Sequence, residues 1–363
     1  MLVCLLWNMK KLFALILLPA LAVSVFYFFR VRGVPRENTK ITNASVTSEK
    51  NTGSVYNSPI GIEYLRSQKI ESNAPAIEEV LSDGSNYKRY IASYISEGNK
   101  VYGLLTVPME APPEKGFPAV VFNHGYIPPA QYITTQNYAS YVDYLAKNGF
   151  VVFKIDFRGN GESEGDPSGS YFSSAYTIDA VSAVKSLQKY ESVNPERIGM
   201  WGHSMSGNVV LRSMLISEDI KAGVIWAGAV YSYADFAQYG ISDNSYVHKP
   251  YETREGKQEQ NREISPEVQK IRTEPDKIDF SNDFWSAVSL TQNIKYLSGA
   301  VQLHHSVNDS VVNIGYTRNL EDVLKSAGKD YSVYEYEGGG HNIVSPYYET
   351  AMQRTVEFFK EKL

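Results

Sequence analysis

The chain has 363 residues, of which 43% are hydrophobic and 21% are charged. These proportions are typical of folded proteins, and a chain of this length can bury a large core. The formal net charge is −5, and no basic stripe runs along the sequence, which argues against a nucleic-acid partner. The only cysteine, Cys4, lies near the start of the sequence, which excludes disulfides and thiolate metal sites from the rest of it.

Residues 1–32 have the character of a separate module. An apolar run over residues 12–29 is flanked by two lysines before it and two arginines after it. As a helix this run would reach roughly 27 Å, close to the thickness of the hydrocarbon core of a bilayer. We expect a signal anchor that holds the protein in a membrane, with the rest of the chain outside the cytoplasm. Cleavage after the small residues 20–22, which would release a secreted protein, is the alternative.

Residues 33–75 are rich in Asn, Ser and Thr and contain few large apolar side chains. This composition predicts a flexible polar linker. Alternating apolar residues over 87–95 and 101–107 then flank Glu97-Gly98-Asn99, which predicts a hairpin. A catalytic domain is therefore expected over residues 76–363.

The rest of the chain alternates between strand and helix patterns. Apolar runs predict strands over 117–122, 151–155, 197–201, 300–305 and 331–336. Helical patterns cover 138–147, 177–190, 208–215, 315–326 and 347–362. Strands that alternate with helices predict an α/β fold in which helices cover both faces of a mostly parallel sheet.

The segment Gly202-His203-Ser204-Met205-Ser206-Gly207 joins a predicted strand to a predicted helix. A serine on such a turn is the arrangement of a nucleophile elbow, which lifts the hydroxyl above the end of the strand. Gly202 occupies the small position two residues before the serine. Ser206 stands two residues after it, where glycine is usual, so the G-x-S-x-G pattern is met in relaxed form.

A serine nucleophile needs a base, normally a histidine that is oriented by a carboxylate. The chain has six histidines, and the chain order expected around a nucleophile elbow is Ser, then Asp or Glu, then His. His341 follows three glycines after the last predicted strand. Asp309 lies in the polar turn after the strand before it. We therefore predict Ser204, Asp309 and His341 as a catalytic triad.

Five segments in this order resemble the α/β-hydrolase superfamily, and within it the catalytic domain of the prolyl oligopeptidase (S9) serine peptidases and their esterase relatives. They are NHGY at 123–126, DFRGNGESEG at 156–165, GHSMSG at 202–207, HHSVNDSVV at 304–312 and GGGHN at 338–342. The resemblance implies an α/β-hydrolase fold. It also implies an oxyanion hole formed by the backbone N–H groups of Met205 and Tyr126.

The same resemblance implies roles for two further segments. The loop 156–165 would brace the floor of the active site, with Asp156 and Arg158 as structural partners. Acidic residues and Pro167 argue against the alternative that this Gly-x-Gly loop binds a dinucleotide. Residues 231–297 would form a cap insertion. Its aromatic residues would line the substrate pocket or pack the cap onto the domain, and both readings apply to Tyr239, Tyr246, Phe284 and Trp285.

The residues therefore predict a serine hydrolase that cleaves carboxylic esters or small amides through an acyl-enzyme, without a cofactor or a metal. A small S9-like peptidase that acts on short peptides is the first alternative. A hydrolase-fold protein that binds at a surface without turnover is the second. Adjacent His304 and His305 would point to opposite faces of their strand, so they are not expected to share a metal.

Overall fold

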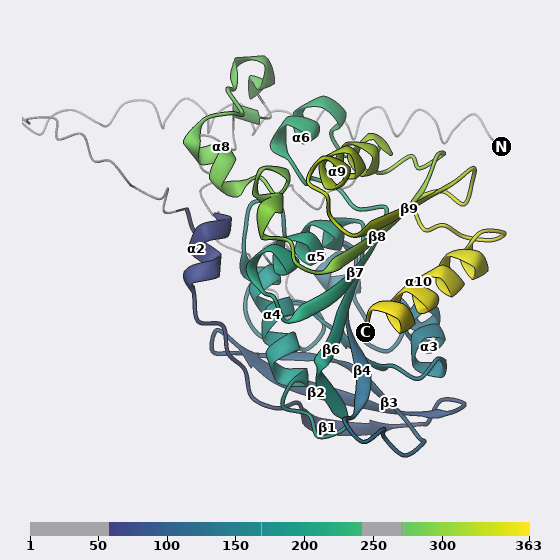
Figure 1. Ribbon diagram of the computed structural model, residues 1–363. Coiled ribbons are helices and arrows are strands. Elements are labelled where there is room, and N and C mark those ends of the chain that lie inside the picture. Colours follow the sequence, from purple (N-terminus) through teal and green to yellow (C-terminus); the bar gives the residue numbers. More distant parts are fainter. Residues whose placement is uncertain (1–57, 168, 242–269, 272) are drawn as a thin grey trace, which may run out of the picture. The chain divides into compact units, whose positions relative to one another are not determined.

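The computed structural model describes residues 58–167, 169–241, 270–271 and 273–363 (Figure 1). The predicted signal anchor at 1–32 and most of the predicted linker lie outside these residues. In the described part of the chain, no helix is long and apolar enough to cross a membrane. The anchor therefore stays a prediction.

Within the described residues, nine strands form one sheet in the order β1-β2-β3-β5-β4-β6-β7-β8-β9. The pairs β1·β2, β2·β3 and β3·β5 are antiparallel. All the pairs from β5 through β4 to β9 are parallel. The mostly parallel sheet that the sequence predicts is therefore confirmed. The strands are β1 Ala76–Leu81, β2 Tyr87–Ser96, β3 Asn99–Pro108, β4 Phe117–Asn123, β5 Val151–Ile155, β6 Val193–His203, β7 Ile220–Trp226, β8 Ala300–Ser306 and β9 Tyr331–Tyr336.

Helices cover both faces of this sheet (Figure 1). Helices α3 (Ala139–Lys147) and α10 (Tyr348–Lys362) share one apolar cluster, and α4 (Ala175–Leu187), α5 (Met205–Ile216) and α9 (Gly315–Ser326) share the other. On β4, Val121 belongs to the second cluster while Val120 and Phe122 belong to the first. Successive side chains of a strand point to opposite faces, so a strand that is buried on both sides reads as a continuous apolar run.

The structure differs from the sequence prediction at residues 58–81. Within the predicted flexible linker, Ile62–Ser67 form helix α2, and Ile62 and Leu65 are buried against the core. Strand β1 was not predicted, because its residues are mostly exposed and do not alternate cleanly. Two buried side chains are sufficient to fix so short a helix against the domain, although its surrounding sequence is polar.

The predicted cap segment, residues 231–297, leaves the sheet after β7 and returns to it at β8. Its described part contains α6 (Tyr233–Tyr239), α8 (Asp283–Val288) and the short helices η2 (Pro275–Lys277) and η3 (Thr291–Tyr296). Trp285 is buried and lies 4.9 Å from the Tyr233 ring, which supports the packing role for this residue. Tyr246 lies outside the described residues.

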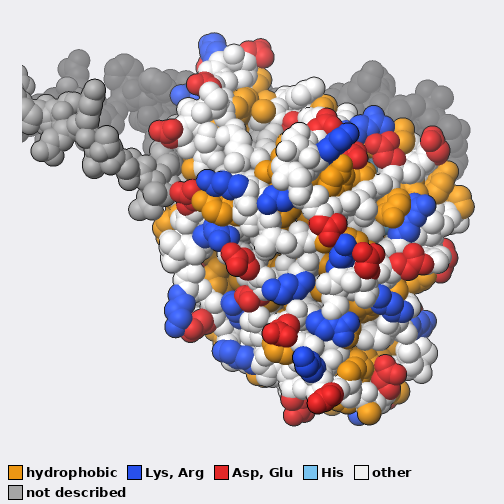
Figure 2. Space-filling model, viewed as in Figure 1, with side chains coloured by type: hydrophobic (Ala, Val, Ile, Leu, Met, Phe, Trp, Pro, Cys, Tyr) orange, Lys and Arg blue, Asp and Glu red, His pale blue; other side chains and the backbone are white. Residues whose placement is uncertain are grey.

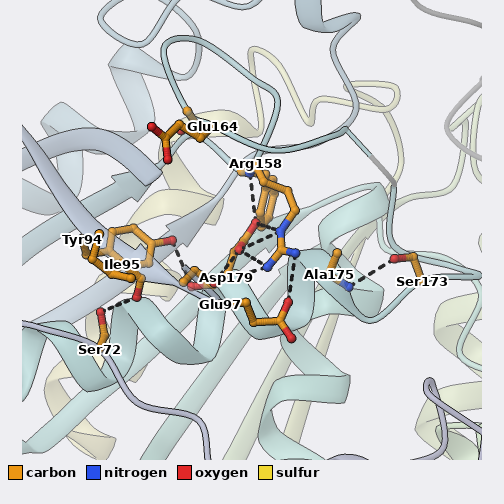
Figure 3. Close-up of polar contacts among 12 residues, drawn as sticks. Ser72, Tyr94, Ile95, Glu97, Arg158, Glu164, Ser173, Ala175 and Asp179 are labelled. Atoms are coloured by element: carbon orange, nitrogen blue, oxygen red, sulfur yellow. Dashed lines mark hydrogen bonds and ion pairs between the residues drawn. The ribbon is translucent and has the colours of Figure 1, made fainter. Parts of the chain in front are cut away.

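A buried ion pair holds the loop after β5 (Figure 3). The Arg158 guanidinium donates to both oxygens of Asp179 on α4, with a shortest distance of 2.7 Å. The backbone N–H of Arg158 donates to the same carboxylate. Ser96 donates to Asp179 at 2.6 Å, and Glu97 accepts from Arg158 at 2.9 Å. Asp156 accepts the hydroxyl of Tyr132 at 2.5 Å. These contacts agree with the structural role that the family resemblance implies for Asp156 and Arg158.

Replacing Asp179 by Ala should destabilise the fold by about 3–5 kcal/mol, because it leaves the Arg158 guanidinium buried without its carboxylate. Chemical denaturation at neutral pH measures this difference. Glu97→Ala is the matched control, because Glu97 contacts the same guanidinium from a half-exposed position and should cost about 0–1 kcal/mol. Equal losses for the two variants would contradict this account of the loop.

Candidate active site

Ser204 is the single residue between the end of β6 and the start of α5. Its backbone has φ 54° and ψ −119°, a conformation that non-glycine residues rarely adopt. The Ser204 N–H donates to the carbonyl of Trp226 on β7 at 2.9 Å, which holds the turn against the neighbouring strand. A Cβ on Gly202 would lie 2.6 Å from the Ser206 carbonyl oxygen, so the helix approaches the strand only because residue 202 is glycine.

The departure from the G-x-S-x-G pattern at Ser206 has a structural explanation. The Ser206 hydroxyl donates to the carbonyl of His124 in the loop after β4, at 2.5 Å. The close backbone approach that glycine normally permits occurs one residue later, where a Cβ on Gly207 would lie 2.6 Å from the Gly228 Cα. Ser206 therefore connects the elbow to the loop that carries Tyr126.

The three predicted triad residues lie in hydrogen-bond contact. His341 Nε2 is 2.9 Å from Ser204 Oγ, and His341 Nδ1 is 2.8 Å from Asp309 Oδ2. The Asp309 side chain is completely buried, whereas that of His341 is 16% exposed. The residues come from the ends of β6, β8 and β9, which meet at the same edge of the parallel sheet (Figure 1). This arrangement can move a proton from the serine to the histidine.

Four donors surround the Asp309 carboxylate. The N–H groups of Val311 and Val312 donate to Oδ1 at 2.8 and 3.0 Å, and His305 Nε2 lies 3.2 Å from Oδ2, the atom that faces His341. Burial by itself would raise the pKa of Asp309, but the hydrogen bonds from His305, His341 and Val312 outweigh it and hold this pKa well below its ordinary value. The carboxylate is therefore ionised at neutral pH and able to orient His341.

The contact between His305 and Asp309 was not predicted from the sequence. Its signal is the position of His305 four residues before the aspartate, at the end of the same buried strand. His305 Nδ1 lies 2.6 Å from the Thr317 hydroxyl on α9. The neighbouring His304 points to the other face of the sheet, where its Nδ1 lies 2.8 Å from the Tyr336 hydroxyl. In the described residues, no group of three or more His, Cys, Asp or Glu side chains is placed to hold a metal ion.

The loop that carries His341 is attached directly to the turn that carries Asp309. The Ser306 hydroxyl donates to the carbonyl of Gly338 at 2.8 Å, and the N–H of Gly340 donates to Asn308 Oδ1 at 2.9 Å. Gly339 and Gly340 have φ values of 99° and 59°, which glycine adopts without steric cost. The glycines thus allow the turn toward Ser204, and the two hydrogen bonds fix its position.

The two residues predicted to donate to the oxyanion line one small cavity. Met205 is the first residue of α5, where a backbone N–H has no acceptor within its own helix. Tyr126 follows β4, and both residues line a cavity of about 10 Å³ together with His124, Asn160 and Tyr176. This volume is about the space that one water molecule needs. His124 is buried, and its Nε2 has no hydrogen-bond partner.

The low pKa of Asp309 has a consequence for stability. Because the pKa is lower in the folded than in the unfolded state, the carboxylate stabilises the fold above the unfolded value of about 3.9, and this contribution is lost as the pH falls below it. We expect the difference in free energy of unfolding between the wild type and Asp309→Asn to be largest near pH 7 and to shrink below about pH 4. Urea unfolding at a series of pH values measures it, and a difference that stays constant down to pH 2.5 would contradict the assignment.

Comparison with known proteins supports the same class of enzyme. The family described as "Serine aminopeptidase, S33" matches residues 116–250. The human protein ABHD12B is 26% identical over 60% of this chain and 53% of its own length. The uncharacterized peptidase YtmA of Bacillus subtilis is 26% identical over 72% of this chain and 88% of its own length. The chain therefore spans about half of the first relative and most of the second.

Two solved structures share the fold. Acetyl xylan esterase 1 from Thermoanaerobacterium aligns with a TM-score of 0.59 and 15% identity, over 82% of this chain and 90% of the esterase. Dipeptidyl peptidase 4 of Porphyromonas gingivalis aligns with a TM-score of 0.56 and 18% identity, over 77% of this chain and 36% of the peptidase. The chain therefore has the α/β-hydrolase fold, and it resembles serine hydrolases, among them the S9 peptidase catalytic domain and related esterases.

Proposed function

We propose that this protein hydrolyses carboxylic esters or small amides through an acyl-enzyme formed on Ser204. The observation that carries the proposal is the continuous set of hydrogen-bond contacts from Asp309 through His341 to Ser204. A serine hydroxyl is a weak nucleophile until a base accepts its proton, and His341 Nε2 stands at the distance that this transfer requires. No cofactor is needed for this chemistry.

In the first half of the reaction, the Ser204 oxygen attacks the substrate carbonyl carbon while its proton passes to His341 Nε2. Asp309 stabilises the imidazolium that forms. The protonated histidine then donates its proton to the leaving alcohol or amine, and the acyl group stays on Ser204. In the second half, His341 takes a proton from water, the hydroxide oxygen attacks the acyl carbon, and the acid is released as Ser204 recovers its proton.

The negative charge that develops on the substrate oxygen needs donors that are already in place. We assign this role to the backbone N–H groups of Met205 and Tyr126. The first stands at the amino end of α5, where the helix dipole also favours negative charge. The hydrogen bond from Ser206 to the His124 carbonyl supports the assignment, because it ties the loop of Tyr126 to the helix of Met205.

The acetyl xylan esterase named above is a structural relative whose substrate is an acetyl ester by its name. Short-chain esters are therefore the first substrates to test.

A peptidase that acts on short peptides is the second candidate. It is favoured by the description of the matching family as a serine aminopeptidase and by the similarity to YtmA. The same triad would serve both reactions, since an amide differs from an ester in its leaving group and not in the charge on the oxyanion.

A fluorophosphonate probe should label the wild-type protein and leave Ser204→Ala unlabelled, and Ser204→Ala should lose about 10⁵-fold or more in kcat on a short-chain nitrophenyl ester. Ser186→Ala is the matched control, because it also removes a fully buried hydroxyl but lies on α4, where that hydroxyl has no partner. Labelling of Ser204→Ala at the wild-type level would refute the proposal. Aminoacyl anilides that are cleaved as efficiently as the esters would favour the peptidase.

We also propose that residues 1–32 anchor the protein in a membrane, on the basis of the apolar run and its flanking charges. The full-length chain should remain in the membrane fraction after a wash at high salt and alkaline pH. A chain that begins at Gly33 should appear in the soluble fraction with its esterase activity retained. An uncleaved protein in the soluble fraction would contradict the anchor. A shortened protein in the soluble fraction would favour cleavage of a signal peptide.

A further inference from the structure

His203, the residue before the nucleophile, lies between two parts of the active site. It is buried at the end of β6, and its ring centroid is 4.6 Å from that of His341. His203 Nδ1 is 2.7 Å from the hydroxyl of Tyr138, and His203 Nε2 is 2.9 Å from the backbone carbonyl oxygen of His341. The Tyr138 hydroxyl in turn accepts the N–H of Gly125 at 3.0 Å. A continuous chain of hydrogen bonds therefore runs from Gly125 to His341.

The groups at the two ends determine the direction of every bond in this chain. The Gly125 N–H can only donate, so the Tyr138 oxygen accepts from it, and the single hydroxyl hydrogen of Tyr138 is left for His203 Nδ1. The carbonyl of His341 can only accept, so His203 Nε2 must carry the hydrogen. Of the two neutral tautomers of His203, only the one with hydrogen on Nε2 satisfies all three bonds.

Burial keeps both side chains in these protonation states. Burial, with a smaller effect from the charge of His341, lowers the pKa of His203 to about 3. Burial also raises the pKa of the Tyr138 hydroxyl, which therefore keeps its proton. The chain of bonds is thus the same throughout the neutral range of pH.

Two backbone features, at Gly125 and at Tyr138, allow these hydrogen bonds to form. A Cβ on Gly125 would lie 2.6 Å from the Tyr138 hydroxyl and 3.1 Å from His203 Nδ1. These hydrogen bonds therefore form only because residue 125 is glycine. Tyr138 has φ 60° and ψ 20°, a left-handed conformation that a bulky residue adopts at a cost.

We propose that His203 is a positioning residue for the hydrolase, which acts by fixing the backbone of His341 and, through Tyr138, the oxyanion loop at Gly125-Tyr126 relative to Ser204. This inference rests on the proposed function. Three segments that supply the base, the nucleophile and an oxyanion donor are far apart in the sequence. His203 precedes the nucleophile, and it contacts the backbone of the base directly and the oxyanion loop through Tyr138. Its loss should slow the chemical step more than it weakens substrate binding.

Two substitutions of His203 test its two hydrogen bonds one at a time. His203→Asn keeps an acceptor near the position of Nδ1 and loses the donor to His341. His203→Gln reaches the position of Nε2 with an amide donor and loses the acceptor for Tyr138. Tyr138→Phe removes the same bond as His203→Gln from the other side, and it also removes the acceptor of the Gly125 N–H. Tyr87→Phe is the matched control, because it removes a buried hydroxyl that donates to Asp143 on α3 at 2.7 Å.

We expect kcat on p-nitrophenyl acetate, per site titrated with fluorophosphonate, to fall by about 10- to 100-fold in His203→Asn, His203→Gln and Tyr138→Phe. KM should change by less than about threefold, and Tyr87→Phe should keep the wild-type kcat. The double variant Tyr138→Phe/His203→Gln should be no slower than Tyr138→Phe, because the bond that His203→Gln breaks is already lost in that variant. A purely structural role would instead lower the thermal midpoint of each variant and leave kcat per titrated site unchanged.

Folded His203→Asn and His203→Gln proteins with wild-type kcat would overturn the inference. If Tyr138→Phe does not fold, the two His203 variants decide the question. Failure of all three variants to fold while Tyr87→Phe folds would also overturn it, since the role would then be structural. Failure of the proposed function looks different, because wild type and Ser204→Ala would then give equal rates and equal labelling.

Discussion

The active site depends on one backbone conformation, that of Ser204. Its positive φ costs on the order of 1–3 kcal/mol for a non-glycine residue, and such a conformation persists only where the surroundings determine it. Here the surroundings are the hydrogen bond to Trp226 and the tight contact between Gly202 and the first turn of α5. Strand and helix are held closely at this turn. The serine hydroxyl lies there within hydrogen-bond distance of His341, which the loop after β9 supplies.

The polar groups around this serine are buried, and buried polar groups must keep their hydrogen-bond partners. A buried carboxylate without donors would be costly, so Asp309 is found with backbone and histidine donors around it. The donors on His305, Val311 and Val312 come from the strand and turn around Asp309 itself, and His341 comes from the loop after β9. The loop after β5 is organised in the same way by Arg158 and Asp179. Buried polar side chains need hydrogen-bond partners, and these hydrogen bonds restrict the conformations of the segments that carry them.

Much of the fold and the triad could be predicted from the sequence because their signals are local. The elbow is an apolar strand, a small-residue turn and a helix in succession, and Asp309 and His341 each follow a recognisable strand. Other features depend on contacts that no local pattern encodes. Helix α2 forms in a polar stretch because Ile62 and Leu65 reach the core, and the bond between His305 and Asp309 depends on how a turn folds back on its own strand. The partnership of Tyr138 with His203 joins residues 65 positions apart.

The place where residues 231–297 leave and rejoin the sheet has an evolutionary consequence. Strands β7 and β8 are parallel neighbours, so the intervening segment starts and ends at fixed positions on adjacent strands, whatever its length. The entropic cost of closing a loop rises only with the logarithm of its length, so residues can be gained or lost here at small expense. The register of the strands would be untouched by such changes. Insertions and deletions in this segment can therefore accumulate while Ser204, Asp309 and His341 keep their places at the ends of β6, β8 and β9.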